Sequence, residues 1–194
     1  MIRYPSGAYD GTKVLFSWRK SPSNGHHLYE YDTLSGGVRQ LTDGQGVSDV
    51  EGVYLPNGDI VFSSTRCVIA VDCMGHPALN LFRCGADGTR IRRLGFDQVT
   101  TDSPSVLHDG RIVFTRWEYN DRNPVYQSPL MQMNPDGTGQ GGYYNNNSAC
   151  PTSLHHAQAI PGSRKVIAVA TGHHTVQAGK LVVLARAPGL GAGR

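Results

Sequence analysis

Short β-rich runs recur along the chain, and each follows a turn that contains glycine. A short apolar run bounded by turn residues is typical of a β-strand, and glycine supplies the positive φ that a tight hairpin requires. Four such runs, KVLFSW, DIVFSS, RIVFTRW and RKVIAVA, follow Gly11, Gly58, Gly110 and Gly162, which are 47, 52 and 52 residues apart. A strand and turn that recur about every 50 residues predict the stacked four-stranded blades of a β-propeller.

Each repeat contains a strand, a Gly turn, a second strand, a long loop, a third strand, another Gly turn and a fourth strand. We expect blades over residues 4–43, 47–96, 102–144 and 154–185. The last blade has no pattern for a fourth strand, because the chain continues as an irregular or truncated tail, 186–194. The fold class is therefore predicted as all-β, a partial β-propeller with about three and a half blades, and we expect it to be a fragment of a larger propeller.

The direction of the strands sorts the loops of such a fold onto two ends. Successive antiparallel strands alternate in direction, so both Gly turns of a blade lie at one end, while the long loop and the crossing to the next blade lie at the other. By this count most histidines fall at the loop-rich end, and His108 falls beside a Gly turn. The clustered histidines are His26, His27, His76, His155, His156, His173 and His174. This clustering is the strongest functional signal in the sequence.

Composition narrows the classes of partner. Charged residues make up 17% of the 194 residues, below the usual ~25%, and Gly (24) and Pro (11) are plentiful, as in a turn-rich all-β protein. The net charge is +3, and Lys and Arg are scattered without a basic stripe, so no nucleic-acid partner is expected. No stretch approaches the ~18 apolar residues of a membrane-spanning helix, and no secretory signal follows Met1.

Several motifs carry a resemblance to known families. They are YLPNGDIVFSSTRC, NLFRCGADGTRIRRLGFDQ, DGRIVFTRWEYNDR, QMNPDGTGQ, IPGSRKVIAVATGHH and QAGKL. The repeats resemble TolB-type, WD-like propeller repeats, in which a short strand, a P-D-G turn and an I-x-F strand recur. A closer resemblance is to proteins related to the hydrazine synthase alpha subunit, in their propeller-containing middle region. It extends from about Tyr4 to Leu184.

The resemblance implies a large, multidomain, extracytoplasmic protein, periplasmic in a bacterium, whose other domains or subunits are the partners of this segment. It also implies that any c-type haem is carried by other parts of the full-length chain, and this segment contains no C-x-x-C-H sequence. One departure concerns Ala149 and Cys150, which stand where the family pattern has aromatic residues. That departure puts ligand contacts by this crossing in doubt.

One loop gathers the residue types that bind zinc. Cys67, Cys73 and His76 share it, but their C-x5-C-x2-H spacing matches no recognised zinc motif. A Cys67–Cys73 disulfide, a metal or haem-associated site, and ordinary thiols all stay open. His173 and His174 follow a strand directly, so at most one faces the central axis, either as a metal ligand or proton donor, or as an anchor for the loop.

A second group consists of ligand or rim contacts. Arg116, Trp117, Glu118 and Asp121 lie in one run that could hold a polar ligand, although an internally paired rim loop is the commoner use of such a run. Arginine recurs at the end of three second strands, at Arg19, Arg66 and Arg116, which favours an ion-pair role, for instance with Asp49, Glu51 or Asp102. His155 and His156 lie where a crossing enters a first strand, and the loop-anchor interpretation leads for them.

Two functional hypotheses follow from these residues. The first is a non-catalytic propeller module that binds or scaffolds partners, since no complete catalytic motif is present. The second is part of a metal- or haem-dependent redox enzyme of the hydrazine synthase type, in which the His/Cys-rich loop end covers the centre. The residues assign no cofactor to this segment, and zinc here or haem in other parts of the full-length chain stay open as alternatives.

Overall fold

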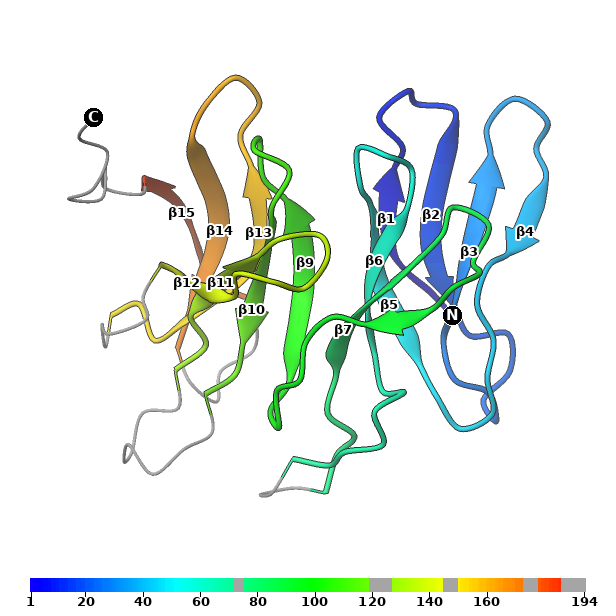
Figure 1. The fold of residues 1–194 in the computed structure, drawn as a ribbon, viewed down its shortest axis with the longest axis horizontal. Helices are drawn as coiled ribbons and strands as arrows, with labels where there is room; N and C mark the ends of the chain where they lie inside the picture. Colours follow the sequence, from blue (N-terminus) through cyan, green and yellow to red (C-terminus); the bar gives the residue numbers. More distant parts are fainter. Residues whose placement is uncertain (72–74, 119–126, 145–149, 173–177, 186–194) are drawn as a thin grey trace. The chain divides into compact units, whose positions relative to one another are not determined.

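The computed structural model describes residues 1–71, 75–118, 127–144, 150–172 and 178–185, and every regular element among these residues is a β-strand (Figure 1). The strands form four sheets, three of four strands and one of three. We call these sheets blades 1 to 4 in chain order. Among the described residues there is no helix that is long and apolar enough to cross a membrane.

The second strand of each blade overlaps one of the four predicted runs. Blade 1 contains β1 (Ile2–Gly7), β2 (Lys13–Trp18), β3 (His27–Asp32) and β4 (Val38–Gln40). Blade 2 contains β5 (Asp49–Tyr54), β6 (Ile60–Ser64), β7 (Asn80–Cys84) and β8 (Arg92–Arg93). Blade 3 contains β9 (Thr101–Val106), β10 (Ile112–Arg116), β11 (Leu130–Met133) and β12 (Gly141–Tyr144). Blade 4 contains β13 (Ser153–Ala159), β14 (Lys165–Thr171) and β15 (Lys180–Ala185), and the expected tail 186–194 lies outside the described residues.

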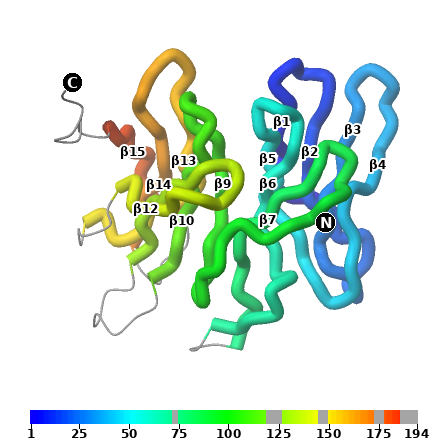
Figure 2. Tube along the Cα trace, viewed as in Figure 1, coloured from blue at the N-terminus to red at the C-terminus, as the bar shows by residue number. Residues whose placement is uncertain are grey.

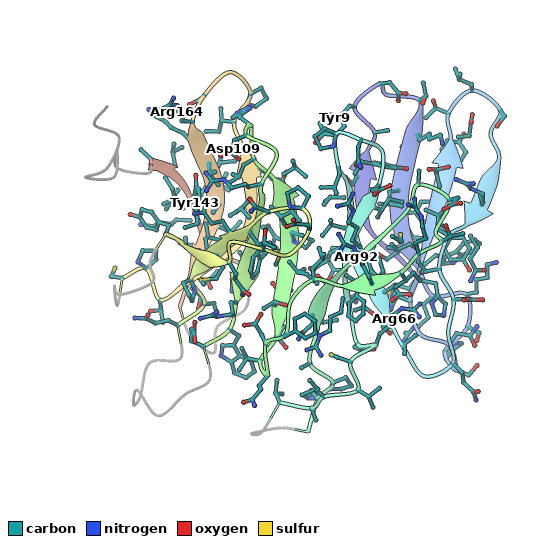
Figure 3. The ribbon with its side chains drawn as sticks, in the orientation of Figure 1. Tyr9, Arg66, Arg92, Asp109, Tyr143 and Arg164 are labelled. Atoms are coloured by element: carbon teal, nitrogen blue, oxygen red, sulfur yellow. The ribbon has the colours of Figure 1, made fainter. Side chains whose placement is uncertain are left out.

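The chain divides into two compact units, Met1–Pro104 and Ser105–Arg194. Unit 1 contains blades 1 and 2, and unit 2 contains blade 4 and most of blade 3, because the division falls within β9. In unit 1 the Gly turns gather at one end of the strands and the long loops at the other (Figure 2). Tyr9, beside the first Gly turn, lies at the first end, and Arg66 lies toward the second (Figure 3).

Hydrogen bonds from threonine fix three of the Gly turns. Asp10, Asp87 and Asp136 each accept bonds of 2.7 to 3.0 Å from the backbone N–H and the hydroxyl of the threonine two residues later. These bonds lower the pKa of Asp10 and of Asp87. The glycine between the two residues has a φ of 73° to 91° in the three turns. Asp-Gly-Thr therefore specifies the tight turn through both its side chains and its backbone.

The core of unit 1 lies between its two blades. Leu15 and Leu28 project from blade 1 into a cluster with Ile60, Phe62 and Phe82 of blade 2, and all five are buried. The Phe62 and Phe82 rings stack with centroids 6.1 Å apart. Burying one such side chain stabilises the fold by about 1.5–3 kcal/mol.

Unit 2 repeats this packing with smaller side chains. Val113 and Leu130 of blade 3 contact Leu154, Val166 and Ala168 of blade 4, and all five side chains are buried. In each unit, therefore, one blade inserts an aliphatic pair from its second and third strands into the facing sheet. This repeated contact holds the blades together and positions their first strands.

Candidate binding site on the first strands

The first strand of every blade contains a residue in the left-handed region that is not glycine. The φ angles are 54° at Tyr4, 58° at Glu51, 53° at Ser103 and 52° at His156. In β1, β5 and β13 these residues lie where the strand register shifts, which marks a β-bulge. Such a backbone costs about 1–3 kcal/mol and is concentrated at functional sites. The repeated bulge is therefore the candidate site.

In each first strand, the left-handed residue and the residue before it are together called the bulge pair. The bulge pairs are Arg3–Tyr4, Val50–Glu51, Asp102–Ser103 and His155–His156. Most of these residues are ionisable, in contrast to the apolar second strands of the same blades. The bulge pairs therefore place guanidinium, carboxyl and imidazole groups on the first strand, which is an edge strand of its own sheet in every blade.

Glu51 links the bulges of two strands in unit 1. Its Oε2 accepts hydrogen bonds from the backbone N–H of Ser103 at 2.7 Å and from the hydroxyl of Ser63 at 3.0 Å. The Ser103 hydroxyl donates a longer bond of 3.4 Å to Oε1. Hydrogen bonds to a carboxylate are stronger than bonds between neutral groups, so Glu51 holds both strained residues in place.

Asp102 is the unusual titratable group of the site. Burial, and then the nearby negative charge of Glu51, raise the pKa of Asp102 to about 8, while a hydrogen bond with Ser103 acts in the opposite direction. Its Oδ1 is buried and has no hydrogen-bond partner among the residues that the structure describes. A carboxyl group in this environment is protonated at neutral pH and is able to donate a hydrogen bond.

The histidine bulge pair of unit 2 combines a buried and an exposed ring. His155 is buried, and burial, with a smaller contribution from His156, lowers the pKa of His155 to about 4. His156 is exposed, and the two ring centroids lie 6.4 Å apart. His155 therefore stays neutral at physiological pH, whereas His156 presents an accessible imidazole.

Arg66 joins a buried network at the loop-rich end of unit 1. Its Nε and Nη2 contact the two oxygens of Asp49 at 2.9 and 2.7 Å, and Nη2 also bonds the carbonyl oxygen of Asp43. Asp49 further accepts a bond from the Ser64 hydroxyl at 2.6 Å and lies 3.5 Å from His27 Nδ1. Asp49 is one of the three carboxylates that the sequence analysis expected to pair with these arginines. The contacts of Arg66 join parts of unit 1 to one another.

The second arginine of this group behaves differently. Arg116, the last residue of β10, forms an ion pair with Glu118 two residues later, which agrees with internal pairing of this run. Trp117 lies between them in the chain and is half-buried. Asp121 lies outside the described residues, so a ligand contact by the whole run stays a prediction.

The structure describes two of the five expected metal ligands, Cys67 and His76. Cys67 is half-buried with its Sγ 3.7 Å from the carbonyl oxygen of Ala78, and His76 is exposed. Cys73, His173 and His174 lie outside the described residues. Within the described ranges, no three His, Cys, Asp or Glu side chains are placed to hold a metal ion together.

Sequence reasoning missed the bulge itself. It named Glu51 and Asp102 as partners for arginine, whereas Glu51 bonds to Ser103 and Ser63. A usable signal was present: Tyr4, Glu51 and Ser103 each precede the next turn glycine by seven residues, and His156 does so by six. Polar residues that recur at a fixed distance before a turn glycine, inside a predicted strand, are not explained by core packing. Their spacing could have indicated a repeated polar site.

Comparison with known proteins places the fold. The chain resembles hydrazine synthase from Kuenenia stuttgartiensis, with a TM-score of 0.81 and 17% identity over 96% of this chain and 31% of that one. It resembles TolB from Acinetobacter baumannii (TM-score 0.67, 13% identity, 96% and 44%) and a TolB from Agrobacterium tumefaciens (0.60, 19%, 73% and 48%). The chain thus spans less than half of each of these proteins. No family model and no curated protein matches the sequence.

The protein is an all-β, partial β-propeller, as the sequence predicted, with structural neighbours among TolB proteins and hydrazine synthase. At these identities the likeness establishes the fold. The three-stranded blade 4 agrees with the expectation of about three and a half blades within the described residues.

Proposed function

We propose that this chain is a binding and scaffolding module of a larger, extracytoplasmic protein related to the hydrazine synthase alpha subunit. The observation that carries the proposal is the bulge pair, repeated on the first strand of all four blades and mostly ionisable. Strained residues of this kind are retained where they present groups to a partner. The partial coverage of hydrazine synthase and TolB supports a larger protein, whose other domains or subunits are the partners.

Charge reversal in the full-length protein tests the binding role. His156→Glu changes an exposed bulge residue, and Arg164→Glu, an exposed residue at the Gly-turn end of the same unit, is the matched control (Figure 3). Quantitative co-purification with the remaining subunits is expected to fall at least tenfold for His156→Glu and to stay unchanged for Arg164→Glu. Equal co-purification by both variants and the unmodified protein would contradict the proposal.

The extracytoplasmic location is tested separately. A fusion of the full-length protein to alkaline phosphatase, which is active outside the cytoplasm, is expected to be active in a bacterial host, while the matching β-galactosidase fusion is expected to be inactive. The reverse pattern would exclude an extracytoplasmic role without affecting the binding test.

The high TM-score to hydrazine synthase favours a second candidate, the propeller of a metal- or haem-dependent redox enzyme. Cys67 and His76 are the described members of its ligand set. We expect elemental mass spectrometry of the purified full-length protein to find zinc or iron near one equivalent. That metal should be lost in Cys67→Ala and His76→Ala but retained in the control Cys84→Ala, whose thiol is buried. A protein without bound metal would eliminate the metal version of this candidate.

A further inference from the structure

Three second strands end at or near an arginine, and two of these arginines have a carboxylate partner among the described residues. Arg66 pairs with Asp49, and Arg116 pairs with Glu118. The third, Arg19, directly follows β2 at the loop-rich end of unit 1 and is half-buried (Figure 1). Its guanidinium forms no ion pair within the described ranges. The charge of Arg19 is therefore available to an anion from outside these residues.

Strand register places more polar side chains on the face of blade 1 that carries Arg19. Arg3 of β1 pairs with Ser17 of β2, which pairs in turn with Leu28 of β3, so the three side chains share one face. Side chains two residues apart also share a face, so Arg19 joins this group two residues after Ser17. For the same reason His26 joins it two residues before Leu28. We call Arg3, Ser17, Arg19 and His26 the basic cluster.

Two buried atoms of the basic cluster have no hydrogen-bond partner among the residues that the structure describes. They are the hydroxyl oxygen of Ser17, a residue that is completely buried, and Nε2 of His26. In blades 2 and 3 the hydroxyl groups of Ser63 and Thr115, which also directly follow the phenylalanine of a second strand, both donate to groups of first strands. Because a buried polar group without a partner is destabilising, Ser17 and His26 indicate that a hydrogen-bonding ligand fits here.

The charges of the basic cluster are positive and unbalanced. Burial, and then the positive charges of Arg19 and Arg3, lower the pKa of His26. Arg3, like Arg19, has no carboxylate partner in the described part of the chain. The buried carboxylate at the start of β5, Asp49, already contacts Arg66 through both of its oxygens. An anion at the basic cluster would therefore meet two unpaired guanidinium groups.

We propose that the basic cluster binds a small oxyanion of the phosphate type. A phosphate group presents at least three strong acceptor oxygens, and arginine binds such groups through two parallel hydrogen bonds. The Ser17 hydroxyl donates to a third oxygen, and His26 donates from Nε2 when that nitrogen carries the proton. A small ligand is required because Ser17 is completely buried. This inference does not depend on the proposed binding of other domains or subunits.

Calorimetric titration of the full-length protein with inorganic phosphate tests the site. We expect saturable binding, weakened about tenfold or more in Arg19→Gln, because hydrogen bonds between charged groups are lost. The matched control is Arg92→Gln, which removes the charge of an exposed arginine from blade 2 of the same unit (Figure 3). This control is expected to bind phosphate as the unmodified protein does. Circular dichroism checks that both variants fold.

Ser17→Ala distinguishes a ligand contact from a contribution to the fold. Its hydroxyl group has no partner among the described residues, so its loss is expected to leave the thermal unfolding midpoint without phosphate unchanged. The affinity for phosphate is expected to fall about fivefold or more. Phosphate should also raise the unfolding midpoint of the unmodified protein and of Arg92→Gln more than that of Arg19→Gln, because the ligand binds the folded state.

Two results would overturn the proposal. The first is the absence of saturable phosphate binding by the unmodified protein, which would leave water or a carboxylate of another domain as the partner of Arg19. The second is equal affinity of Arg19→Gln and Arg92→Gln for phosphate, which would show that phosphate binds elsewhere as an adventitious ion only.

Discussion

The two units join their blades through the same aliphatic contact but through different polar groups. In unit 1 the polar contacts centre on buried carboxylates: Glu30 of blade 1 accepts a bond of 2.9 Å from the Tyr54 hydroxyl, and Asp49 of blade 2 lies beside His27 of blade 1. In unit 2, blades 3 and 4 are joined by bonds between neutral groups among others. The Thr115 hydroxyl donates to the Leu154 carbonyl oxygen at 2.9 Å, for example.

Because of this difference, we expect different changes to destabilise each unit. Bonds to a charged group contribute more than neutral ones, but a buried charge that loses its partner is strongly destabilising. Unit 1 should therefore respond to changes in ionisation and to loss of single partners. Unit 2 should respond chiefly to changes in packing, because removal of a neutral bond leaves no buried charge behind.

Asp102 gives the largest expected effect in unit 1. Its pKa of about 8 in the folded protein lies above its ordinary value of 3.8, so between these pH values the folded state binds a proton that the unfolded state lacks. The free energy of unfolding contributed by this group therefore falls as the pH rises from about 4 to about 8. Asp102→Asn does not titrate, and we expect its advantage over the unmodified protein to grow through this window and level off above it.

Urea unfolding of both proteins between pH 4 and pH 9 measures this advantage. Each unit of pKa corresponds to about 1.4 kcal/mol, so the difference should be plain by pH 8. If the two proteins show parallel stability profiles, Asp102 is not protonated in the folded state, and the contrast between the units loses its main support.

Asp49 gives the next effect. Asp49→Ala leaves the guanidinium of Arg66, with 21% of its side chain exposed, without its paired carboxylate. Breaking a buried pair in this way is expected to cost about 3–5 kcal/mol in urea unfolding. The control Asp109→Asn alters a pair that is 50% and 32% exposed and should cost less than about 1 kcal/mol. Similar costs for both would show that burial does not strengthen the Asp49 pair.

Substitutions at two turn glycines of blade 2 distinguish the cost of backbone strain from the cost of a clash between blades. Gly58 and Gly88 have φ of 86° and 84°, but a Cβ on Gly88 would lie 2.0 Å from the Leu41 carbonyl oxygen of blade 1, whereas Gly58 has no atom within 4 Å. Gly58→Ala should cost about 1–2 kcal/mol from its φ. Gly88→Ala should cost more by thermal unfolding, because the blades must also move apart. Equal costs would argue that this turn is not pressed against blade 1.

The sequence predicted the blades well because their signals are local. Asp-Gly-Thr fixes a turn through bonds within three residues, and the apolar run in KVLFSW marks a strand whose middle residues are buried on both faces. The bulge was not predictable in the same way, because the φ of Glu51 is maintained by Ser103, which lies 52 residues later in the chain. The functions assigned to Cys73, His173 and His174 stay predictions, since these residues lie outside the described ranges.

The smallest effect compares one hydrogen bond from each unit directly. Burial, and then the hydrogen bond to Glu30 and the charge of Glu30, raise the pKa of Tyr54. Tyr54→Phe removes this bond and should cost about 1.5–3 kcal/mol because the acceptor is charged. Thr115→Val removes the bond to the Leu154 carbonyl oxygen and should cost about 0.5–1.5 kcal/mol.

Glu30 keeps Lys13 and Arg39 as partners at 3.1 and 2.9 Å, so the Tyr54→Phe cost isolates one bond without leaving the charge unpaired. Each variant should be followed by hydrogen exchange within its own unit, because hydrogen exchange reports local stability. A larger cost for Thr115→Val would reverse the comparison and place the stronger polar link between blades in unit 2.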